Sequence, residues 1–322
     1  MNGWLALLGE STAIAAGVAA GVSVLSWHLL ARVDRDQTAP ARRADLALLA
    51  GSLPMLSALA VLVALVLPSL LHTSGIQADH CGIHSHHRHL CAVHGAIPQA
   101  GLLLVGAAAA ALWMVRAGRL ALAHRRAHRA LSALQRLGQR TNLGRFPRVL
   151  VPGSPWLSVA VGVLRPRVVL SASLESHLAP EALEAVLAHE EAHLVRHDPR
   201  AMSFLAWAGL FGVPGVSGKV RDAFHEASEE AADANAADEV GPHAVAAALV
   251  AVARLAPGRP PAFALGFGDT AVQRRVHILL QGHRLGDRSL APRLLLLVVA
   301  ATALIAIGGS EWIHHAVESL LQ

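Results

Sequence analysis

Two histidines and a glutamate stand at a spacing that suits metal chemistry. His189 and His193 are four positions apart, and Glu190 follows the first histidine directly. On a helix, residues four apart project from the same face, so the two imidazoles can bind one metal ion. Zinc is the ion for which this spacing is best known. Glu190 can then act as the general base toward an attacking water without binding the metal itself.

The residues around this pair predict a single helix from Pro180 to His197. Proline suits the first turn of a helix, and the acidic Glu181 favours the N-terminal end. Arg196 and His197 favour the C-terminal end, where the helix dipole is negative. Both histidines of the candidate metal pair therefore lie well inside one regular element.

The third ligand is expected from a second, alanine-rich helix over residues 224–237. Glu229 and Asp233 lie four apart there and share one face. Glu229 would complete a site of two histidines and one carboxylate, which leaves the fourth position for water. Asp233 would orient one of the histidines. Glu226 and Glu230 are alternative ligands, but Glu229 is favoured because it alone is followed by an aspartate four positions later.

The composition places these two helices in a membrane protein. Hydrophobic residues make up 54% of the 322 residues, and the mean hydropathy is +0.46. That is too apolar for an ordinary soluble domain. A span needs about 20 apolar residues. Four stretches meet this requirement and are expected to cross the membrane: 11–31, 46–71, 95–115 and 294–310.

Arginine placement predicts which segments are cytoplasmic. Basic residues concentrate after the first and third stretches and before the fourth. We therefore expect three spans within residues 1–115, a cytoplasmic domain at 116–290, and a fourth span with a short extracytoplasmic tail at 291–322. Both termini would be extracytoplasmic. Since membrane topology already explains the net charge of +5, no direct binding of nucleic acid is expected.

A further apolar run, residues 201–217, lies between the two candidate metal-binding helices. A single membrane crossing there would put His189 and Glu229 on opposite sides of the bilayer, where they could not share an ion. We therefore expect a helix or hairpin that dips into the membrane surface or packs against it. Pro214 and the glycines around it fit a broken segment that does not span.

The extracytoplasmic loop at residues 72–95 is rich in histidine and contains both cysteines of the chain. Three interpretations remain open: a disulfide-closed hairpin that presents imidazoles to a divalent or copper ion, a mixed Cys/His metal site, or a polar loop with a structural disulfide. In the first two, the loop would bind a second metal ion and could make the protein a metal-responsive transducer. The candidate residues are His72, His80, Cys81, His84, His86, His87, His89, Cys91 and His94.

Together these motifs resemble a known group of enzymes. The gluzincin metallopeptidases share the pattern His189-Glu190-x-x-His193-x-x-Arg196-x-Asp198, followed by Glu229-x-x-x-Asp233. The segment 163–170, which precedes the helix expected at 180–197, resembles the BlaR/MecR-type antirepressor metallopeptidases. These are bacterial membrane sensor-transducers whose cytoplasmic zinc protease domain leads to cleavage of a transcriptional repressor. The resemblance covers roughly residues 145–280.

The resemblance implies a zinc endopeptidase in a bacterial plasma membrane, with a protein substrate that is a cytoplasmic repressor. It implies that His189, His193 and Glu229 bind Zn²⁺ and that Glu190 is the catalytic base. Asp198, like Asp233, would support the ligands. The expected fold is an α-helical multi-pass membrane protein of four spans with a cytoplasmic α+β zincin-type domain. Short strands are expected at 148–151, 159–163 and 168–170, with a closing helix at 273–280 where Arg274 or Arg275 could face the site.

Two other functions remain open from the residues. The metal motif is shared with membrane proteases of the HtpX and CAAX-prenyl-endopeptidase type, which implies quality-control cleavage of membrane proteins. A non-catalytic metal-binding receptor would need the histidines but not Glu190, so the glutamate argues against it. The tail after the fourth stretch is too short for a penicillin-binding domain, so a β-lactam signal is not expected. The chain has no tyrosine, so His225, His243 or an arginine would have to stabilise the oxyanion.

Overall fold

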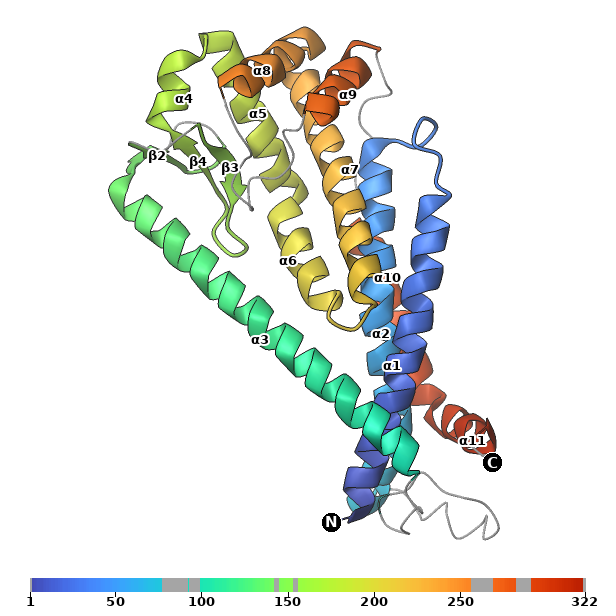
Figure 1. The fold of residues 1–322 in the computed structure, drawn as a ribbon. Helices are drawn as coiled ribbons and strands as arrows, with labels where there is room; N and C mark the ends of the chain where they lie inside the picture. The colour runs from blue at the N-terminus through green and yellow to red at the C-terminus, as the bar shows by residue number, and fades with distance from the viewer. Residues whose placement is uncertain are drawn as a thin grey trace.

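The computed structural model describes residues 2–76, 92, 99–141, 145–152, 156–255, 269–281 and 291–320. In these ranges four strands follow three long helices, and shorter helices follow the strands (Figure 1). The first elements are α1 (Asn2–Ala31), α2 (Pro40–Thr73), α3 (Ala100–Leu137), β1 (Gln139–Thr141), β2 (Arg148–Val151), β3 (Ser158–Val161), β4 (Arg167–Ser171) and α4 (Ala172–His177). The later elements are α5 (Pro180–Arg196), α6 (Asp198–Ala208), α7 (Pro214–Val240), α8 (Pro242–Leu255), α9 (Asp269–Leu280), α10 (Ala291–Gly308) and α11 (Ser310–Leu320).

Three helices are long and apolar enough to cross a membrane, namely α1, α2 and α3. They contain the first two stretches expected from the sequence and residues 100–115 of the third. Most of the fourth stretch lies in α10, whose described apolar part, Leu296–Gly308, is shorter, so a fourth span stays a prediction. Both ends of the chain lie at the end of the long helices that is far from the sheet (Figure 1). The molecule therefore has two parts. We call the apolar parts of α1, α2 and α3 the stem, and we call the part that holds the sheet and α4, α5, α8 and α9 the lobe.

The helices α1 and α3 cross closely near the end of the stem that carries the termini. A Cβ atom added at Gly106 would lie 1.9 Å from the backbone oxygen of Gly9. Only glycine allows the two backbones to approach this closely, as small residues do at crossings of membrane helices. From this crossing α3 diverges from α1 and α2 toward the lobe (Figure 1). The space between the diverging helices receives the hairpin of α6 and α7.

The turn between α6 and α7 is anchored to the long helices. Arg116 of α3 donates hydrogen bonds to the backbone oxygens of Gly209, Leu210 and Gly212, at 2.5, 2.5 and 3.0 Å. These bonds satisfy carbonyl groups that follow the end of α6 and have no partner within the helix. The rings of Trp113 and Phe211 also pack together, 4.8 Å apart. The expected hairpin form of the apolar run at 201–217 is confirmed, and the hairpin packs against the candidate spans. Its predicted position at the membrane surface stays a prediction.

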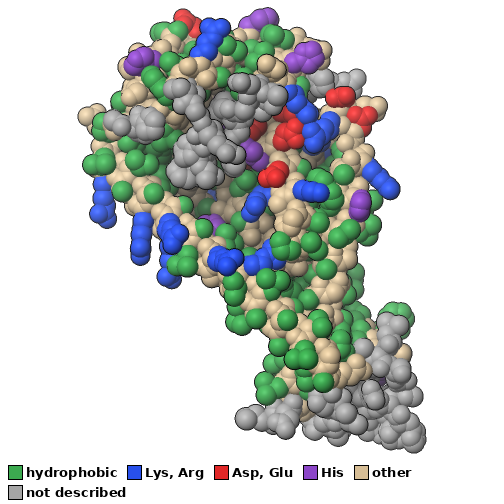
Figure 2. All heavy atoms as spheres, viewed as in Figure 1, with side chains coloured by type: hydrophobic (Ala, Val, Ile, Leu, Met, Phe, Trp, Pro, Cys, Tyr) green, Lys and Arg blue, Asp and Glu red, His purple; other side chains and the backbone are tan. Residues whose placement is uncertain are grey.

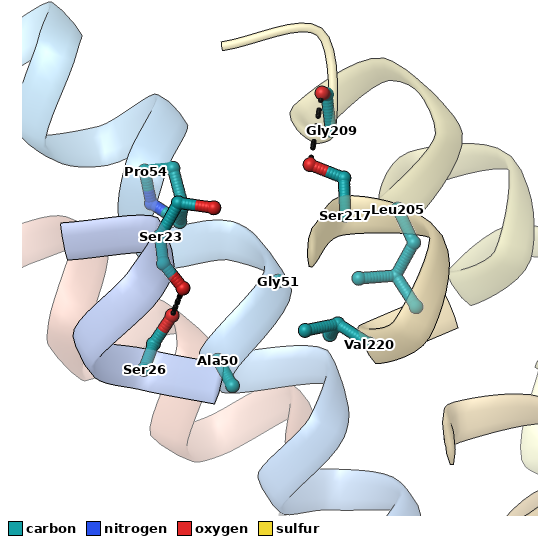
Figure 3. A pocket seen from close by; sticks show the side chains of 9 residues that line it. All are labelled: Ser23, Ser26, Ala50, Gly51, Pro54, Leu205, Gly209, Ser217 and Val220. Carbon is teal, nitrogen blue, oxygen red and sulfur yellow. Dashed lines mark hydrogen bonds between the residues drawn. The ribbon is translucent and has the colours of Figure 1, made fainter. Parts of the chain in front are cut away.

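A small cavity marks the place where this hairpin meets α1 and α2 (Figure 3). Its volume is about 10 Å³, close to the space that one water needs. The hydroxyl of Ser26 donates to the backbone oxygen of Ser23, and that of Ser217 donates to Gly209 on the opposite wall. The Ser23 hydroxyl in turn accepts a hydrogen bond from the backbone nitrogen of Val213. A polar contact therefore attaches the hairpin of α6 and α7 to α1.

The sheet of the lobe has the strand order β1-β2-β4-β3. Strands β2 and β4 are parallel, whereas β1 and β3 pair antiparallel at the two edges. The β-branched Val149, Val168 and Val169 are fully buried. The helices α5 and α8 form the main core beside this sheet. The three expected strands and the helix at 180–197 are confirmed to within two residues, but β1, α4 and α8 were not expected.

A buried ion pair joins the stem to the lobe. Arg43 of α2 binds the Glu230 carboxylate of α7, and these residues are 8% and 3% exposed. Arg274 of α9 lies 3.2 Å from the same carboxylate. Small apolar residues close the contact around the pair, among them Ala44 and Ala227. Because the pair is shielded from water, removing one partner leaves an uncompensated charge.

We expect Glu230→Gln to destabilise the protein much more than Glu226→Gln. Glu226 is a matched control because it binds Arg35 and Arg274 while its side chain is 38% exposed. A broken buried pair costs about 3–5 kcal/mol, which lowers the midpoint of unfolding by roughly 5–15 °C. Thermal unfolding in detergent measures both variants. Equal midpoints would show that the Arg43 pair does not hold the lobe on the stem.

Candidate metal centre

The helix α5 brings the two histidines of the motif together on one face. The Nε2 atoms of His189 and His193 are 3.1 Å apart, and both side chains are largely buried. Pro180 occupies the first turn, as the sequence predicted, and Glu181 is the acidic residue of that turn. The helix packs on the core through its apolar positions, such as Ala185 and Ala188. Packing on that side leaves the histidines directed toward α7.

The helix α7 supplies the third donor. The Glu229 oxygens lie 3.2 Å from Nε2 of His193 and 3.6 Å from Nε2 of His189. These three residues can hold a metal ion between them. Tetrahedral zinc with bonds of 2.0–2.1 Å requires donor atoms about 3.3–3.4 Å apart, so the observed separations fit zinc without rearrangement. The two nitrogens and the carboxylate are therefore arranged as ligands of one ion.

Each of the two histidines has a carboxylate at its other ring nitrogen. Nδ1 of His193 lies 2.8 Å from Oδ2 of Asp198, and Nδ1 of His189 lies 2.9 Å from Oδ1 of Asp233. In a neutral imidazole, a proton on Nδ1 leaves the lone pair on Nε2. Both lone pairs then point into the same space as the Glu229 carboxylate. Such converging donors need a cation or extra protons between them.

The position of Asp198 depends on a left-handed residue. His197 has φ of 61°, the one positive φ among the non-glycine residues that the structure describes. It ends α5 and begins α6. This turn brings Asp198 back beside His193, where Arg196 also lies 3.3 Å from the aspartate. A non-glycine residue in this conformation is uncommon and marks a backbone held by its surroundings.

Arg275 of α9 joins the two acids of α7. It donates to both carboxylate oxygens of Asp233, each at 2.6 Å, and lies 2.9 Å from Oε2 of Glu229. Arg275 is 5% exposed. Its positive charge compensates the two carboxylates and holds them at fixed positions. Of the two arginines considered from the sequence, Arg275 faces the site, whereas Arg274 binds Glu226 and Glu230.

The electrostatics of the site favour protons on the histidines when no metal is bound. Burial lowers the pKa of His193, but attraction to Glu229 and hydrogen bonding with Asp198 outweigh it and raise that pKa to about 10. The pKa of His189 is also raised, because Asp233 and Glu229 outweigh burial. Burial raises the pKa of Glu229, but Arg275 and the histidines hold it well below its usual range. A metal ion would replace these protons.

Glu190 lies beside the histidines on α5 and is 8% exposed. Among the residues that the structure describes, no hydrogen bond or ion pair engages its carboxylate. By contrast, the neighbouring Glu191 lies 3.1 Å from Arg148. An unpaired carboxylate next to the metal ligands can accept a proton from a water at the site.

The other candidates fall into distinct places. Glu226 and Glu230 lie against Arg35 and Arg43 of the N-terminal region, whereas Glu229 is the carboxylate that lies at the two histidines. Nδ1 of His225 lies 3.8 Å from Oε1 of Glu229, so this histidine borders the site, whereas His243 is exposed at the start of α8.

Of the candidate residues in the outer loop, His72 is the last basic residue of α2. The other histidines and the cysteines of the outer loop lie outside the described residues, so that loop stays a prediction.

A larger cavity of about 670 Å³ lies beside α5 and α7 but does not contain the candidate ligands. Apolar residues of α5, Leu183 and Leu187, line it together with Asn235 and Glu239 of α7. These side chains lie on faces of the two helices other than the one that carries His189. The cavity is therefore separate from the candidate metal centre.

Apolar helices of spanning length and a buried cluster of two histidines and a glutamate on two packed helices are the features expected of a membrane metallopeptidase. Residues 90–246, just under half of the chain, match the family model described as BlaR1 peptidase M56. This match confirms the resemblance to the BlaR/MecR-type peptidases. It includes the metal cluster and Asp233 but ends before Arg275. No curated protein and no solved structure matches the chain.

Replacing Arg275 with glutamine should weaken metal binding through the ligands that it positions. Loss of a partner that orients the ligands of a metal typically lowers affinity by about 10–100-fold. Arg274→Gln is the matched control, since Arg274 is partly exposed and does not contact Glu229 or Asp233. Titration of the purified protein with zinc against a chromophoric chelator measures both affinities. Equal affinities would exclude a role of Arg275 in holding the site.

Metal binding should release protons. Because its pKa is raised to about 10, His193 is protonated in the metal-free protein throughout the neutral range, and a metal binds only the neutral imidazole. The apparent zinc affinity should therefore rise with pH between about 6 and 9. Calorimetry at pH 8 in buffers of different ionisation enthalpy measures the released protons. Identical heats in all buffers would contradict this account.

Proposed function

We propose that this protein is a zinc-dependent endopeptidase that cleaves a cytoplasmic transcriptional repressor in response to a signal across the membrane. The observation that carries the proposal is the convergence of His189, His193 and Glu229 at zinc-ligand distances, next to an unpaired Glu190. A structural zinc site would have four protein ligands. Three ligands with an adjacent free carboxylate correspond to a hydrolytic site.

The residues of the chain divide the chemistry between them. A zinc ion bound at this site would polarise the scissile carbonyl and acidify the attacking water. Glu190 accepts the proton of that water and transfers it to the nitrogen of the leaving amine. Asp198 and Asp233 keep the imidazoles in the tautomer that presents Nε2. Arg275 keeps Glu229 ionised, so that its carboxylate stays a ligand. His225, whose Nδ1 atom lies 3.8 Å from Oε1 of Glu229, borders the site and is a candidate for stabilising an oxyanion.

An edge strand beside α5 supports binding of an extended peptide. Strand β3 forms one edge of the sheet, pairs on its other side with β4, and contacts α5. Extended substrates commonly add a strand to such an edge through backbone hydrogen bonds. A flexible segment of a folded repressor fits this mode of binding. The substrate would then pass over the helix that carries His189 and Glu190.

The proposed topology places the lobe in the cytoplasm. Arginines cluster where α1, α2 and α3 leave the apolar stem toward the lobe, as expected of cytoplasmic ends. Both termini lie at the opposite end of the stem (Figure 1). The histidine-rich loop would then face the outside and receive the signal, with a metal ion as one candidate. The chain would then combine a receptor on the outer side of the membrane with a peptidase on the cytoplasmic side.

We expect Glu190→Gln to abolish peptidase activity while zinc remains bound. Loss of a general base lowers the rate by about 10²–10⁴-fold, whereas the three ligands stay in place. Glu184→Gln is the matched control, because this glutamate is exposed on the same helix. Purified protein in lipid is incubated with a repressor encoded beside its gene and, separately, with casein. The readouts are cleavage products and bound zinc.

The outcomes separate the candidate functions. Cleavage of the repressor alone, lost in Glu190→Gln and after chelation, would support the dedicated signalling peptidase. Cleavage of casein as well would favour quality control. Cleavage that survives Glu190→Gln would refute the assigned catalytic base. Bound zinc without cleavage, even when copper, zinc or nickel ions are offered to the outer loop, would favour a metal-binding receptor.

A further inference from the structure

The helix α3 continues far beyond the length that a membrane requires. Its 38 residues extend for about 57 Å at 1.5 Å per residue, whereas the hydrocarbon core is about 30 Å thick. The first half is apolar, and the second half leads to the sheet of the lobe. Leu112 and Val115 are still exposed apolar residues, and the next charged residues are Arg116 and Arg119. The helix therefore leaves its apolar stretch near these arginines.

The second half of α3 has two chemically different faces. Leu131 and Leu134 pack against the valines of β2 and β4, and His124 stacks on Trp207. Gln135, near the end of this inner face, accepts a hydrogen bond from Arg167. These contacts attach one face of α3 to the lobe.

The opposite face carries only basic charge. At 100° per residue, five exposed arginines fall within an arc of about 120°. They are Arg119, Arg125, Arg126, Arg129 and Arg136. We call them the α3 arginine row. No aspartate or glutamate occurs anywhere in α3, so the helix itself offers these side chains no counter-charge.

These arginines also lack partners elsewhere in the described part of the chain. No ion pair or side-chain hydrogen bond from the α3 arginine row is present there. In contrast, Arg35, Arg43, Arg148, Arg274 and Arg275 each bind a carboxylate. In Figure 2, blue side chains project along the lower edge of the lobe, on the side from which the stem extends. Unpaired basic charge is thus present on a helix that connects the apolar stem with the lobe.

We propose that the α3 arginine row binds the headgroups of anionic lipids in the membrane leaflet next to the lobe. The row begins just after the exposed apolar residues Leu112 and Val115, and the exposed Leu122 lies among its first members. An apolar residue between basic ones suits the headgroup level of a membrane. Basic residues within a Debye length of such a surface are attracted by anionic lipid. The headgroups supply the counter-charge that the protein does not. This proposal rests on α3 as a span and is independent of the peptidase activity.

Lipid selection by the full-length protein tests this assignment. Protein in mixed micelles with equimolar phosphatidylglycerol and phosphatidylcholine is re-isolated, and the retained lipids are counted by mass spectrometry. We expect phosphatidylglycerol to be enriched. The variant Arg125→Gln/Arg129→Gln should lower the enrichment by about tenfold to thirtyfold. The control Arg165→Gln/Arg254→Gln removes the same charge from two exposed arginines outside α3 and should retain it.

The remaining arms separate the alternatives. No enrichment in the unmodified protein, or equal loss in both double variants, would overturn the proposal. Competition by inorganic phosphate at matched ionic strength would show that free phosphate binds instead of lipid headgroups, and would also overturn it. Circular dichroism and thermal unfolding check that both double variants fold like the parent. Zinc binding should be unchanged in both, so a failure here does not bear on the metal centre.

Discussion

The packing of α5 against α7 brings together more negative charge than a buried interface tolerates without compensation. Glu229 and Asp233 both lie on α7 toward α5, and Arg275 lies between them. Glu190 of α5 adds an unpaired carboxylate beside the histidines. With neutral histidines, these three carboxylates exceed Arg275 by two negative charges. A divalent cation at the Nε2 atoms would balance that excess, and protons on the histidines compensate it when no metal is bound. The helix contact and the metal centre are therefore one electrostatic unit.

The need to compensate negative charge between α5 and α7 also explains why α9 belongs to the site, although α9 lies outside the matched family segment. Two buried carboxylates a single turn apart would repel each other, and one of them would take up a proton. Arg275 removes that repulsion with a bidentate contact to Asp233 and a further contact to Glu229. The closing helix thus helps to keep Glu229, a candidate ligand carried by α7, ionised.

The parts of this site that follow local periodicity could be read from the sequence. The spacing of His189 and His193, the helix that carries them and the choice of Glu229 all depend on positions within one helix. The role of Asp198 required the family resemblance, since only the left-handed turn at His197 brings it back to His193. The sequence narrowed the arginine that faces the site to Arg274 or Arg275. It could not decide between them, because adjacent residues of a helix point to different sides and the element that packs against this helix was not known.

The fold shows the same limit. The strands with buried valines were predictable, because alternation and β-branched residues mark them. Strand β1 carries polar, largely exposed residues and has no such signal. Helix α8 is apolar and lies in the core, but its sequence carries no chemistry that would draw attention to it. A topological constraint predicted that residues 201–217 form a helix or hairpin that does not cross the membrane. The docking of this hairpin beside the long helices and its anchor at Arg116 are tertiary contacts that no local pattern reveals.

The long helix α7 has a mechanical consequence. It starts at Pro214 beside the spans, and Glu229 lies fifteen residues later, about 22 Å along the helix axis. A tilt of about 5° around the lower end would displace Glu229 by about 2 Å. Zinc–ligand bonds tolerate deviations of only about 0.2 Å. The position of Glu229 relative to His189 and His193 is therefore sensitive to the angle at which α7 leaves the candidate spans.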